Sequence, residues 1–274
     1  MPRDAQEPVL EFEHVTVGFE DNKALDDVSL RAAEGESRVI LGAAGSGKTV
    51  LLKTALGLVK PESGRVFAFG REISSLRETE LFEIRSKMGM LFQESALFDS
   101  LTIEENVAYP LLNQKSIQCP PEEVRPRVEQ ALEFVELGGT LEKFPAELSG
   151  GMRRRAAMAR AVVTAPPLLF YDSPTAGLDP ITAHTIMALV IKERDTAGAT
   201  TLMVTHRYQD GNLMANFRYN SEREQIELAR NGASPKSQTL FMVLREGRLV
   251  FEGEQGELEA SHDPYISKFV KRRE

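Results

Sequence analysis

One segment of the chain, residues 37–49, constrains its fold more than any other: SRVILGAAGSGKT. Its apolar run ends at Gly42 and an apolar-periodic stretch opens at Lys48, so a strand, a glycine-rich turn and a helix are expected in that order. Glycine adopts backbone angles that a Cβ forbids, so consecutive N–H groups of the turn can point inward. Together with the N-terminus of the helix, these N–H groups form a cradle for a polyphosphate.

Residues 42–49, called the phosphate turn below, end in two positions with defined chemistry. In the pattern G-x-x-x-x-G-K-[ST], the lysine reaches the β- and γ-phosphates and the hydroxyl holds Mg²⁺. Lys48 and Thr49 occupy these positions. A glycine-rich turn with an incidental lysine is the alternative that the motif alone leaves open. The expected nucleotide-binding residues are Gly42, Ala43, Ala44, Gly45, Ser46, Gly47, Lys48, Thr49 and Val50.

Composition narrows the class of protein. The chain of 274 residues is 42% apolar and 27% charged, which is typical of a globular protein of one large domain or two lobes. Its formal net charge of −8 argues against nucleic acid as the main partner. No window approaches the roughly 20 apolar residues of a membrane span, and the polar N-terminus lacks the apolar region of a secretory signal. With Cys119 as the single cysteine, a cytosolic protein is predicted.

The residues on either side of the phosphate turn predict two further regions. Apolar alternation over residues 9–30 indicates a small β layer with a bulge in its first strand. Beyond residue 94 the patterns become helical, with Thr102 and Glu105 at the spacing of a capping box and an apolar stripe over residues 124–135. These helices are expected to form an insert between the two halves of an α/β core.

Several polar residues lie within or after this insert. Asp172 ends the apolar run LLFY, so it is expected at the carboxyl end of a parallel strand, beside the phosphate turn, where it would hold Mg²⁺. His206 stands at the tip of the next apolar run, and Asp179 begins a long helix. Ser149 can cap an earlier helix, whose basic run at residues 153–155 is interpreted as a solvated face rather than an anion site.

In this order the segments resemble the motifs of the nucleotide-binding subunit of an ABC transporter, over essentially the whole chain. The resemblance identifies Gln93 as the Q-loop glutamine, LSGG at residues 148–151 as the signature, residues 176–179 as the D-loop and His206 as the switch histidine. Phe19 stands where the family places an aromatic residue that stacks on adenine. Six such motifs at sensible separations form a specific pattern.

The resemblance implies a fold and a division of the chain. The fold class is α/β, an ABC-type P-loop NTPase that spans residues 1–274 as a single domain. Its RecA-like core is expected at about residues 8–93 and 160–274, with an N-terminal antiparallel β subdomain. A helical subdomain is expected at about residues 94–159, and an extra insertion at about residues 209–238.

The resemblance also implies a mechanism that needs two copies of the chain. ATP on the phosphate turn of one copy is closed over by Ser149, Gly150, Gly151 and the D-loop residue Asp179 of the second copy. The implied Mg²⁺ ligands are Thr49, Gln93 and Asp172, and the residues that hold the attacking water are Gln93 and His206. The helical insert is implied to carry a groove that receives a helix of a membrane permease.

A narrower resemblance points to the ATPase of Mla-type (MCE-associated) bacterial phospholipid transporters. It rests on KMGMLFQESALFDSLTIEENVAYPL, ELSGGMRRRAAMARAV and DPYISKFV. It implies two copies on integral membrane permease subunits that are attached to a periplasmic MCE-type lipid-binding protein, at the cytoplasmic face of the inner membrane. The alternatives are a regulatory subunit that does not hydrolyse ATP and a non-transport ABC ATPase. A P-loop kinase or GTPase would leave the signature and His206 unexplained.

Two departures from the family pattern stand out. The general-base position after Asp172 holds Ser173 instead of the usual glutamate. Three interpretations are open: the chain hydrolyses ATP slowly, it is a degenerate copy that pairs with a competent partner, or Ser173 is an engineered trap of the ATP-bound dimer. Slow hydrolysis is favoured. Residue 207, usually acidic, is Arg207, and residues 209–238 form an addition with a possible small hairpin. A tolerated surface loop is favoured there over a docking surface.

Overall fold

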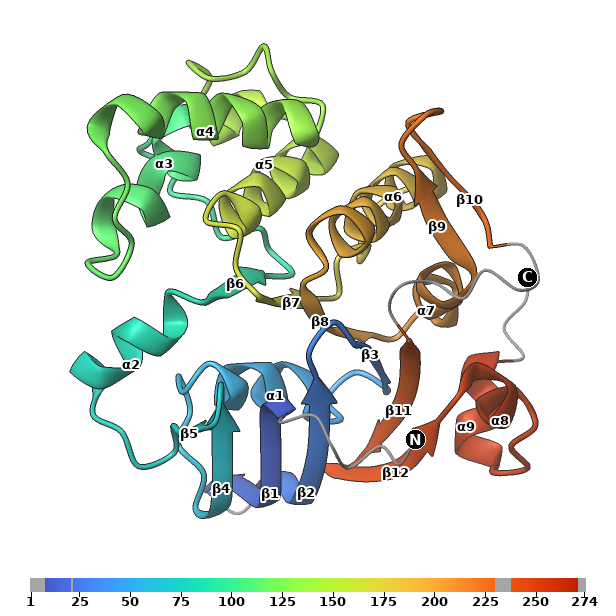
Figure 1. Cartoon of the computed structure of the whole chain (residues 1–274). Coiled ribbons are helices and arrows are strands. Elements are labelled where there is room, and N and C mark those ends of the chain that lie inside the picture. Colours follow the sequence, from blue (N-terminus) through green and yellow to red (C-terminus); the bar gives the residue numbers. More distant parts are fainter. Residues whose placement is uncertain (1–7, 21, 230–237, 271–274) are drawn as a thin grey trace.

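A computed structural model describes residues 8–20, 22–229 and 238–270. Its central element is a six-stranded sheet of strand order β12-β11-β3-β8-β7-β6, in which β12 is antiparallel to β11 and the other neighbours run parallel (Figure 1). These strands are β3 (Ser37–Leu41), β6 (Met88–Leu91), β7 (Leu168–Asp172), β8 (Thr200–Thr205), β11 (Thr239–Arg245) and β12 (Arg248–Gly253). The predicted α/β class is confirmed.

A second sheet is antiparallel and has the order β2-β1-β4-β5. Its strands are β1 (Pro8–Phe19), β2 (Asn22–Ala33), β4 (Ser63–Ala68) and β5 (Arg71–Glu72). The pairing of β1 with β2 shifts register between Phe12 and Val15, which confirms the predicted bulge. Because the shift restores the alternation, Phe12 and Val15 are both buried on the same face.

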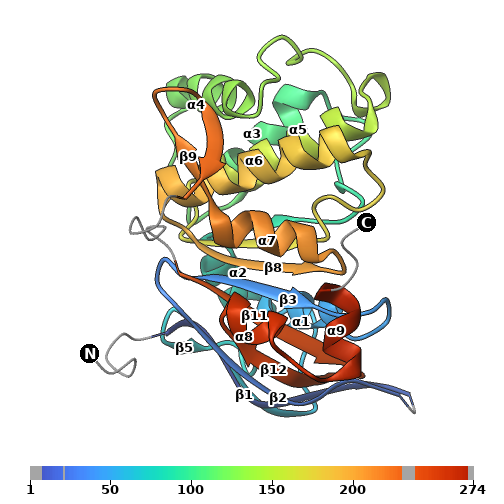
Figure 2. The same cartoon turned by 90° about the vertical axis from the view of Figure 1, so that its right-hand side faces the viewer.

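Helices lie on both faces of the six-stranded sheet and at one end of the molecule. They are α1 (Lys48–Ala55), α2 (Glu78–Arg85), α3 (Ile103–Asn113), α4 (Pro121–Phe134), η2 (Pro145–Glu147), α5 (Gly150–Val162), α6 (Pro180–Ala197), α7 (Tyr208–Asn216), α8 (Gln255–Glu259) and α9 (Pro264–Val270). Figures 1 and 2 show α3, α4 and α5 at one end of the molecule and the antiparallel sheet at the other. Since α5 ends at Val162, the boundary predicted near residue 159 falls within its last turn.

Strands β3, β7 and β8 of the large sheet are buried on both faces and are rich in apolar residues, as central parallel strands are. In β7, Leu168 and Phe170 belong to a core shared with α1, α2 and the antiparallel sheet. Leu169 and Tyr171 point the other way, into a core shared with α3 to α9. The sheet therefore separates two hydrophobic cores, and its carboxyl edge is where loops from both layers meet.

The ends of the helices follow the predicted caps. The Thr102 hydroxyl accepts from the Glu105 N–H at 3.2 Å, and the Glu105 carboxylate accepts from the Thr102 N–H at 2.7 Å, so the capping box before α3 is confirmed. The Ser149 hydroxyl accepts from the Met152 N–H at 3.2 Å and caps α5. At the end of α6, Gly198 has a φ of +69°, which glycine adopts without strain.

The predicted small hairpin is present as β9 (Phe217–Asn220) and β10 (Gln225–Leu228), and it packs along α6 (Figure 1). Buried Arg194 of α6 donates to the Phe217 carbonyl at 2.8 Å and pairs with Asp195 at 2.7 Å. Asp195 in turn accepts from the Tyr219 N–H at 2.7 Å. The hairpin is thus fixed to the core by charged hydrogen bonds. Residues 230–237 of the predicted insertion lie outside the described residues.

Glu193 of α6 is buried, and we expect it to make the stability of the fold depend on pH. Burial raises its pKa from 4.5 to about 7, with Lys192 opposing the rise. The folded state therefore binds a proton more tightly than the unfolded state, and its stability is expected to fall as pH rises from about 4.5 to 7. Glu193→Gln should remove this loss and raise the free energy of unfolding above pH 7, by at most about 3 kcal/mol.

The measurement is chemical denaturation at several pH values, with Glu133→Gln as the control because Glu133 is exposed on α4. Equal effects of the two substitutions across this pH range would contradict the assignment to Glu193.

Candidate functional site

The carboxyl ends of four neighbouring parallel strands bring the predicted residues to one edge of the sheet. Cα pairing places Leu41 beside Thr205, Val204 beside Asp172, and Tyr171 beside Leu91. The loops that follow these strands begin with the phosphate turn, His206, Ser173 and the segment that holds Gln93. Ligands bind at such edges in open α/β sheets because the adjacent loops leave a crevice between them. Gln93 and His206 are both exposed there.

Close packing explains two glycines of the phosphate turn, Gly42 and Gly47. A Cβ on Gly42 would lie 2.4 Å from the Ser46 hydroxyl, and one on Gly47 would lie 2.2 Å from the Ala24 carbonyl oxygen. Gly47 also has a φ of +103° and precedes the first residue of α1, whose N-terminus no described side chain caps. The N–H groups at this helix end are therefore directed toward the space that a phosphate would occupy.

Lys48 folds back over the turn. Its ammonium donates to the carbonyls of Gly42 at 2.9 Å and Ala43 at 2.7 Å. Burial lowers its pKa, and the negative charge of Asp172 opposes that shift. An ammonium held inside the turn by backbone carbonyls can redirect its N–H bonds to an entering anion, which is the chemistry expected of this position.

Thr49 and Asp172 meet at the mouth of the turn. The Thr49 hydroxyl donates to one carboxylate oxygen of Asp172 at 2.8 Å, and the Ser173 hydroxyl donates to the other at 3.2 Å. A hydroxyl and a carboxylate are oxygen ligands of the kind that Mg²⁺ prefers. Over the described ranges, no cluster of three or more His, Cys, Asp or Glu is found.

Ser173 has a constrained backbone. Its φ of +47° is in the left-handed region, its N–H donates to the Val204 carbonyl at 2.8 Å, and its own carbonyl accepts from Arg154 at 3.1 Å. The same guanidinium donates to the Pro174 carbonyl at 3.1 Å. The segment after Asp172 is therefore fixed from both sides.

Arg154 corrects one interpretation of the sequence. Residues 153–155 were expected to form a solvated helix face, and Arg153 is exposed, but Arg154 is buried. Burial lowers the pKa of Arg154, and its Nε has no hydrogen-bond partner among the described residues. The expectation was wrong for Arg154 because the turn after β7 offers it carbonyl acceptors that only the folded chain brings near.

The signature residues lie apart from the phosphate turn in the fold. Ser149, Gly150 and Gly151 form the start of α5, which belongs to the core on one face of the sheet, whereas α1 belongs to the core on the other. A Cβ on Gly151 would lie 2.5 Å from a Thr182 methyl group, so α5 begins directly against α6. Asp179 caps α6 by accepting from the N–H groups of Ile181 and Thr182 at 3.0 Å each. Hydrogen bonds from Thr182 lower the pKa of Asp179.

Three further residues contact this region and were not predicted. Arg154 was described above. Asp210 is buried and accepts from the hydroxyls of Thr175 at 2.8 Å and Thr205 at 2.7 Å, which joins the loops after β7 and β8. Tyr265 of α9 contacts the phosphate turn. No local sequence pattern identifies them, because each acts on a residue that is distant in the chain. Phe19, the expected adenine-stacking residue, is 51% exposed at the end of β1.

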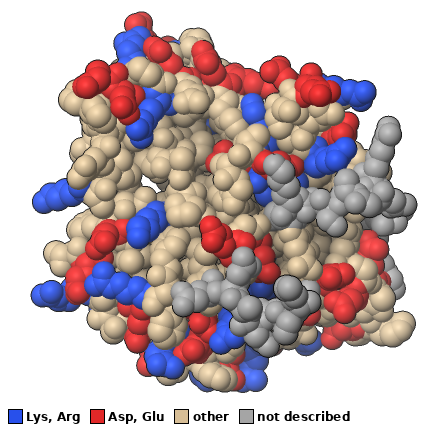
Figure 3. Space-filling model, viewed as in Figure 1, with Lys and Arg blue, Asp and Glu red and all other residues tan. Residues whose placement is uncertain are grey.

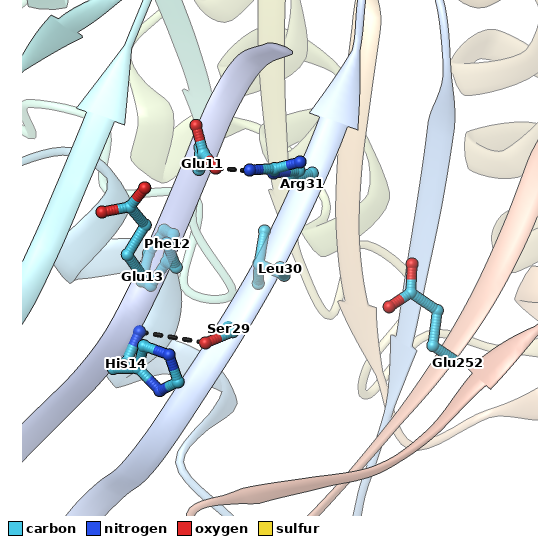
Figure 4. A pocket seen from close by; sticks show the side chains of 8 residues that line it. All are labelled: Glu11, Phe12, Glu13, His14, Ser29, Leu30, Arg31 and Glu252. Atoms are coloured by element: carbon cyan, nitrogen blue, oxygen red, sulfur yellow. Dashed lines mark hydrogen bonds and ion pairs between the residues drawn. The ribbon is translucent and has the colours of Figure 1, made fainter. Parts of the chain in front are cut away.

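A hollow of about 560 Å³ lies elsewhere, on the outer face of β1 and β2 (Figure 4). None of the predicted nucleotide-binding residues lines it. Its charges are already paired, with Arg31 2.6 Å from Glu11 and Arg65 2.6 Å from Glu13. It therefore offers no unpaired charge around which a site could be built.

Within the described ranges, no helix is both long and apolar enough to cross a bilayer. Residues 25–176 match the family model described as ABC transporter. The chain is 40% identical over 197 residues to a probable ribonucleotide transport ATP-binding protein, mkl, of Mycobacterium leprae. That match covers 72% of this chain and 56% of the relative, so the chain spans about half the length of this relative.

Two other comparisons cover more of both proteins. The chain is 32% identical over 263 residues to the intermembrane phospholipid transport system ATP-binding protein MlaF of Haemophilus influenzae, covering 96% of this chain and 90% of MlaF. The solved dimeric cassette MJ0796, bound to ADP and Pi, superposes with a TM-score of 0.74 at 31% identity, covering 89% of this chain and 98% of that one. Together with the geometry of the phosphate turn, these findings show that the chain belongs to the ABC transporter family, as an ATP-binding subunit.

Proposed function

We propose that this chain is the ATP-hydrolysing motor subunit of a bacterial phospholipid transporter. The observation that carries the proposal is the similarity to MlaF along nearly the full length of both proteins, including the region after residue 200. The similarity to the ribonucleotide transport protein covers a smaller part of each chain. ATP and Mg²⁺ would bind at the phosphate turn, where Lys48, Thr49 and Asp172 lie together.

The working form would be a dimer with two shared sites. The start of α5 lies in a different layer from the phosphate turn, so Ser149, Gly150 and Gly151 would act on the nucleotide of a second copy. Their N–H groups and the helix N-terminus suit the γ-phosphate, as they do in the turn itself. The dimeric state of MJ0796 with ADP and Pi supports this arrangement. Asp179, Gln93 and His206 would complete the site around Mg²⁺ and water.

A groove of about 350 Å³ supports a membrane partner. It lies between the end of α1, β6, α3 and α5, and its apolar lining includes Leu58, Met90, Phe92, Phe98 and Tyr109. The walls of the groove come from both the core and the predicted helical subdomain (about residues 94–159). A helix bound there would therefore be displaced when the subdomain moves relative to the core. We assign it to a permease helix, with the chain at the cytoplasmic face of the inner membrane. A periplasmic MCE-type lipid-binding protein would join through the permease.

The charges on one face of the molecule bear on nucleic acid as an alternative partner. On the face in Figure 3, Lys and Arg side chains lie scattered among Asp and Glu rather than gathered into a stripe. A basic stripe is the footprint that nucleic-acid binding needs. The charge pattern of this face therefore gives no support to the alternative of a non-transport ATPase that acts on nucleic acid.

The test is purification of the tagged chain from membranes, with bound lipid identified by mass spectrometry and ATPase measured on the same sample. An integral membrane permease and phospholipid should co-purify. Leu58→Glu should abolish both because it places a charge in the groove, whereas Val250→Glu on β12 should not; the two residues are 50% and 44% exposed. Co-purification of ribonucleotides instead of phospholipid would contradict the proposed cargo. Equal capture of the permease by the two variants would contradict the assignment of the groove to a permease helix.

A further inference from the structure

Tyr265 links α9 to the phosphate turn. Its hydroxyl accepts from the Ala43 N–H at 3.0 Å and donates to the Leu244 carbonyl at 3.1 Å. Ala43 is the second residue of the phosphate turn, and Leu244 lies near the end of β11, the strand beside β3. Tyr265, which lies 222 residues after Ala43 in the sequence, thus ties the start of the turn to the neighbouring strand.

The structure holds this hydroxyl in place. The Asp263 carboxylate accepts from the N–H groups of Tyr265 at 2.7 Å and Ile266 at 3.1 Å, which fixes the first turn of α9. Ile266 is buried in the core. The Tyr265 ring packs edge-on against Phe269, with centroids 5.3 Å apart, and lies 5.4 Å from the Arg245 guanidinium carbon. The phenol therefore reaches the turn from a rigid base.

Leu244, which accepts from the Tyr265 hydroxyl, also lies against the phosphate turn at Gly42. A Cβ on Gly42 would lie 2.7 Å from the Leu244 carbonyl oxygen, so the turn already lies against this carbonyl at Gly42. Tyr265 adds a second attachment one residue later. Two fixed points at the start of a glycine-rich segment limit the conformations open to the residues after it, whose N–H groups must converge on one phosphate.

We propose that Tyr265 is a positioning residue for ATP binding: its hydroxyl clamps the phosphate turn to β11, so that the turn holds its binding conformation before nucleotide arrives. This inference rests on the proposed binding of ATP at the turn. Because the hydroxyl bonds to the backbone N–H of Ala43, its contribution to ATP binding would be preorganisation of the turn. Loss of one hydrogen bond of this kind should weaken ATP binding about two- to tenfold.

The experiment compares Tyr265→Phe with Tyr219→Phe in the full chain. Tyr219 lies on the β9–β10 hairpin, so the control removes a phenol hydroxyl away from the turn. Two quantities are measured: the Kd for ATP with Mg²⁺, and amide hydrogen exchange of the peptide that contains Ala43 in nucleotide-free protein. Tyr265→Phe should raise the Kd about two- to tenfold and speed exchange at Ala43, with kcat at saturating ATP nearly unchanged.

An unchanged Kd or unchanged exchange in Tyr265→Phe would overturn the proposal, and so would equal effects in Tyr219→Phe. Failure of the unsubstituted chain to bind ATP would contradict the proposed ATP binding at the turn. In that case the rate of hydrogen exchange at Ala43 would still test whether Tyr265 holds the turn in place. A change in Tm shared by both variants would show a general effect of the lost phenol on stability and would likewise overturn the clamp.

Discussion

Replacing Ser173 with glutamate is expected to raise ATP turnover by about 10²–10⁴-fold, the usual contribution of a positioned general base. Serine does not accept a proton near neutral pH, whereas a carboxylate at this position, directly after Asp172, would orient or deprotonate the attacking water. The gain corresponds to about 3–5 kcal/mol of barrier. The measurement is steady-state ATPase of the assembled transporter, because the proposed site would be shared between two copies of the chain.

The backbone around residue 173 is suited to this substitution. The Ser173 N–H donates to Val204 and its carbonyl accepts from Arg154, so the direction of the side chain is set by main-chain contacts that glutamate would keep. Serine and glutamate both carry a Cβ, so the φ of +47° strains them alike. Glutamate would also remove the hydroxyl that donates to Asp172, leaving that carboxylate oxygen free for the Mg²⁺ shell.

Ser173→Gln is the matched control, since it has the length of glutamate without the basic carboxylate. Glutamine should leave turnover near the level of the unsubstituted chain. If Ser173→Glu hydrolyses ATP no faster than the unsubstituted transporter, Ser173 does not limit the rate. Turnover would also stay unchanged if this chain were a degenerate partner of a second, competent subunit. Mixtures in which one of these two subunits is labelled would then show which of them carries the active site.

Much of the core of this site could be predicted because its signals are local. Apolar runs that end in Gly42, Asp172 and His206 indicate parallel strands, and the carboxyl ends of such strands meet at one edge whatever their order in the sheet. The cap at Thr102 follows from its spacing of three residues from Glu105, and the cap at Ser149 from a serine placed before a helical pattern; the hydrogen bonds confirm both.

The residues that support the site were not predictable in the same way. A basic residue in a helix is expected on the surface, yet Arg154 is buried because the carbonyls of Ser173 and Pro174 face it in the folded chain. Asp210 and Tyr265 likewise contact residues that no pattern in their own segments indicates. Such contacts depend on how distant loops pack, so they appear only when the whole fold is known.

Lys48→Met should abolish most of the ATPase activity, lowering turnover by about 10²–10³-fold, which is the usual effect of removing one hydrogen-bond donor that stabilises a transition state. Lys48 supplies the one ammonium that lies inside the phosphate turn among the described residues, where it donates to the carbonyls of Gly42 and Ala43. The measurements are ATPase activity of the transporter and the Kd for ATP, which should rise because the phosphates lose this partner.

Lys53→Met separates this effect from a general loss of charge on α1, since Lys53 is exposed on the same helix. Methionine is close to lysine in volume, so neither substitution should open a cavity. Burial already lowers the pKa of Lys48, which means that the fold disfavours its charge, so Lys48→Met should keep or raise the Tm while activity is lost. A fall in activity that tracks a fall in Tm, or an equal fall in Lys53→Met, would show that the ammonium at position 48 does not act on the nucleotide.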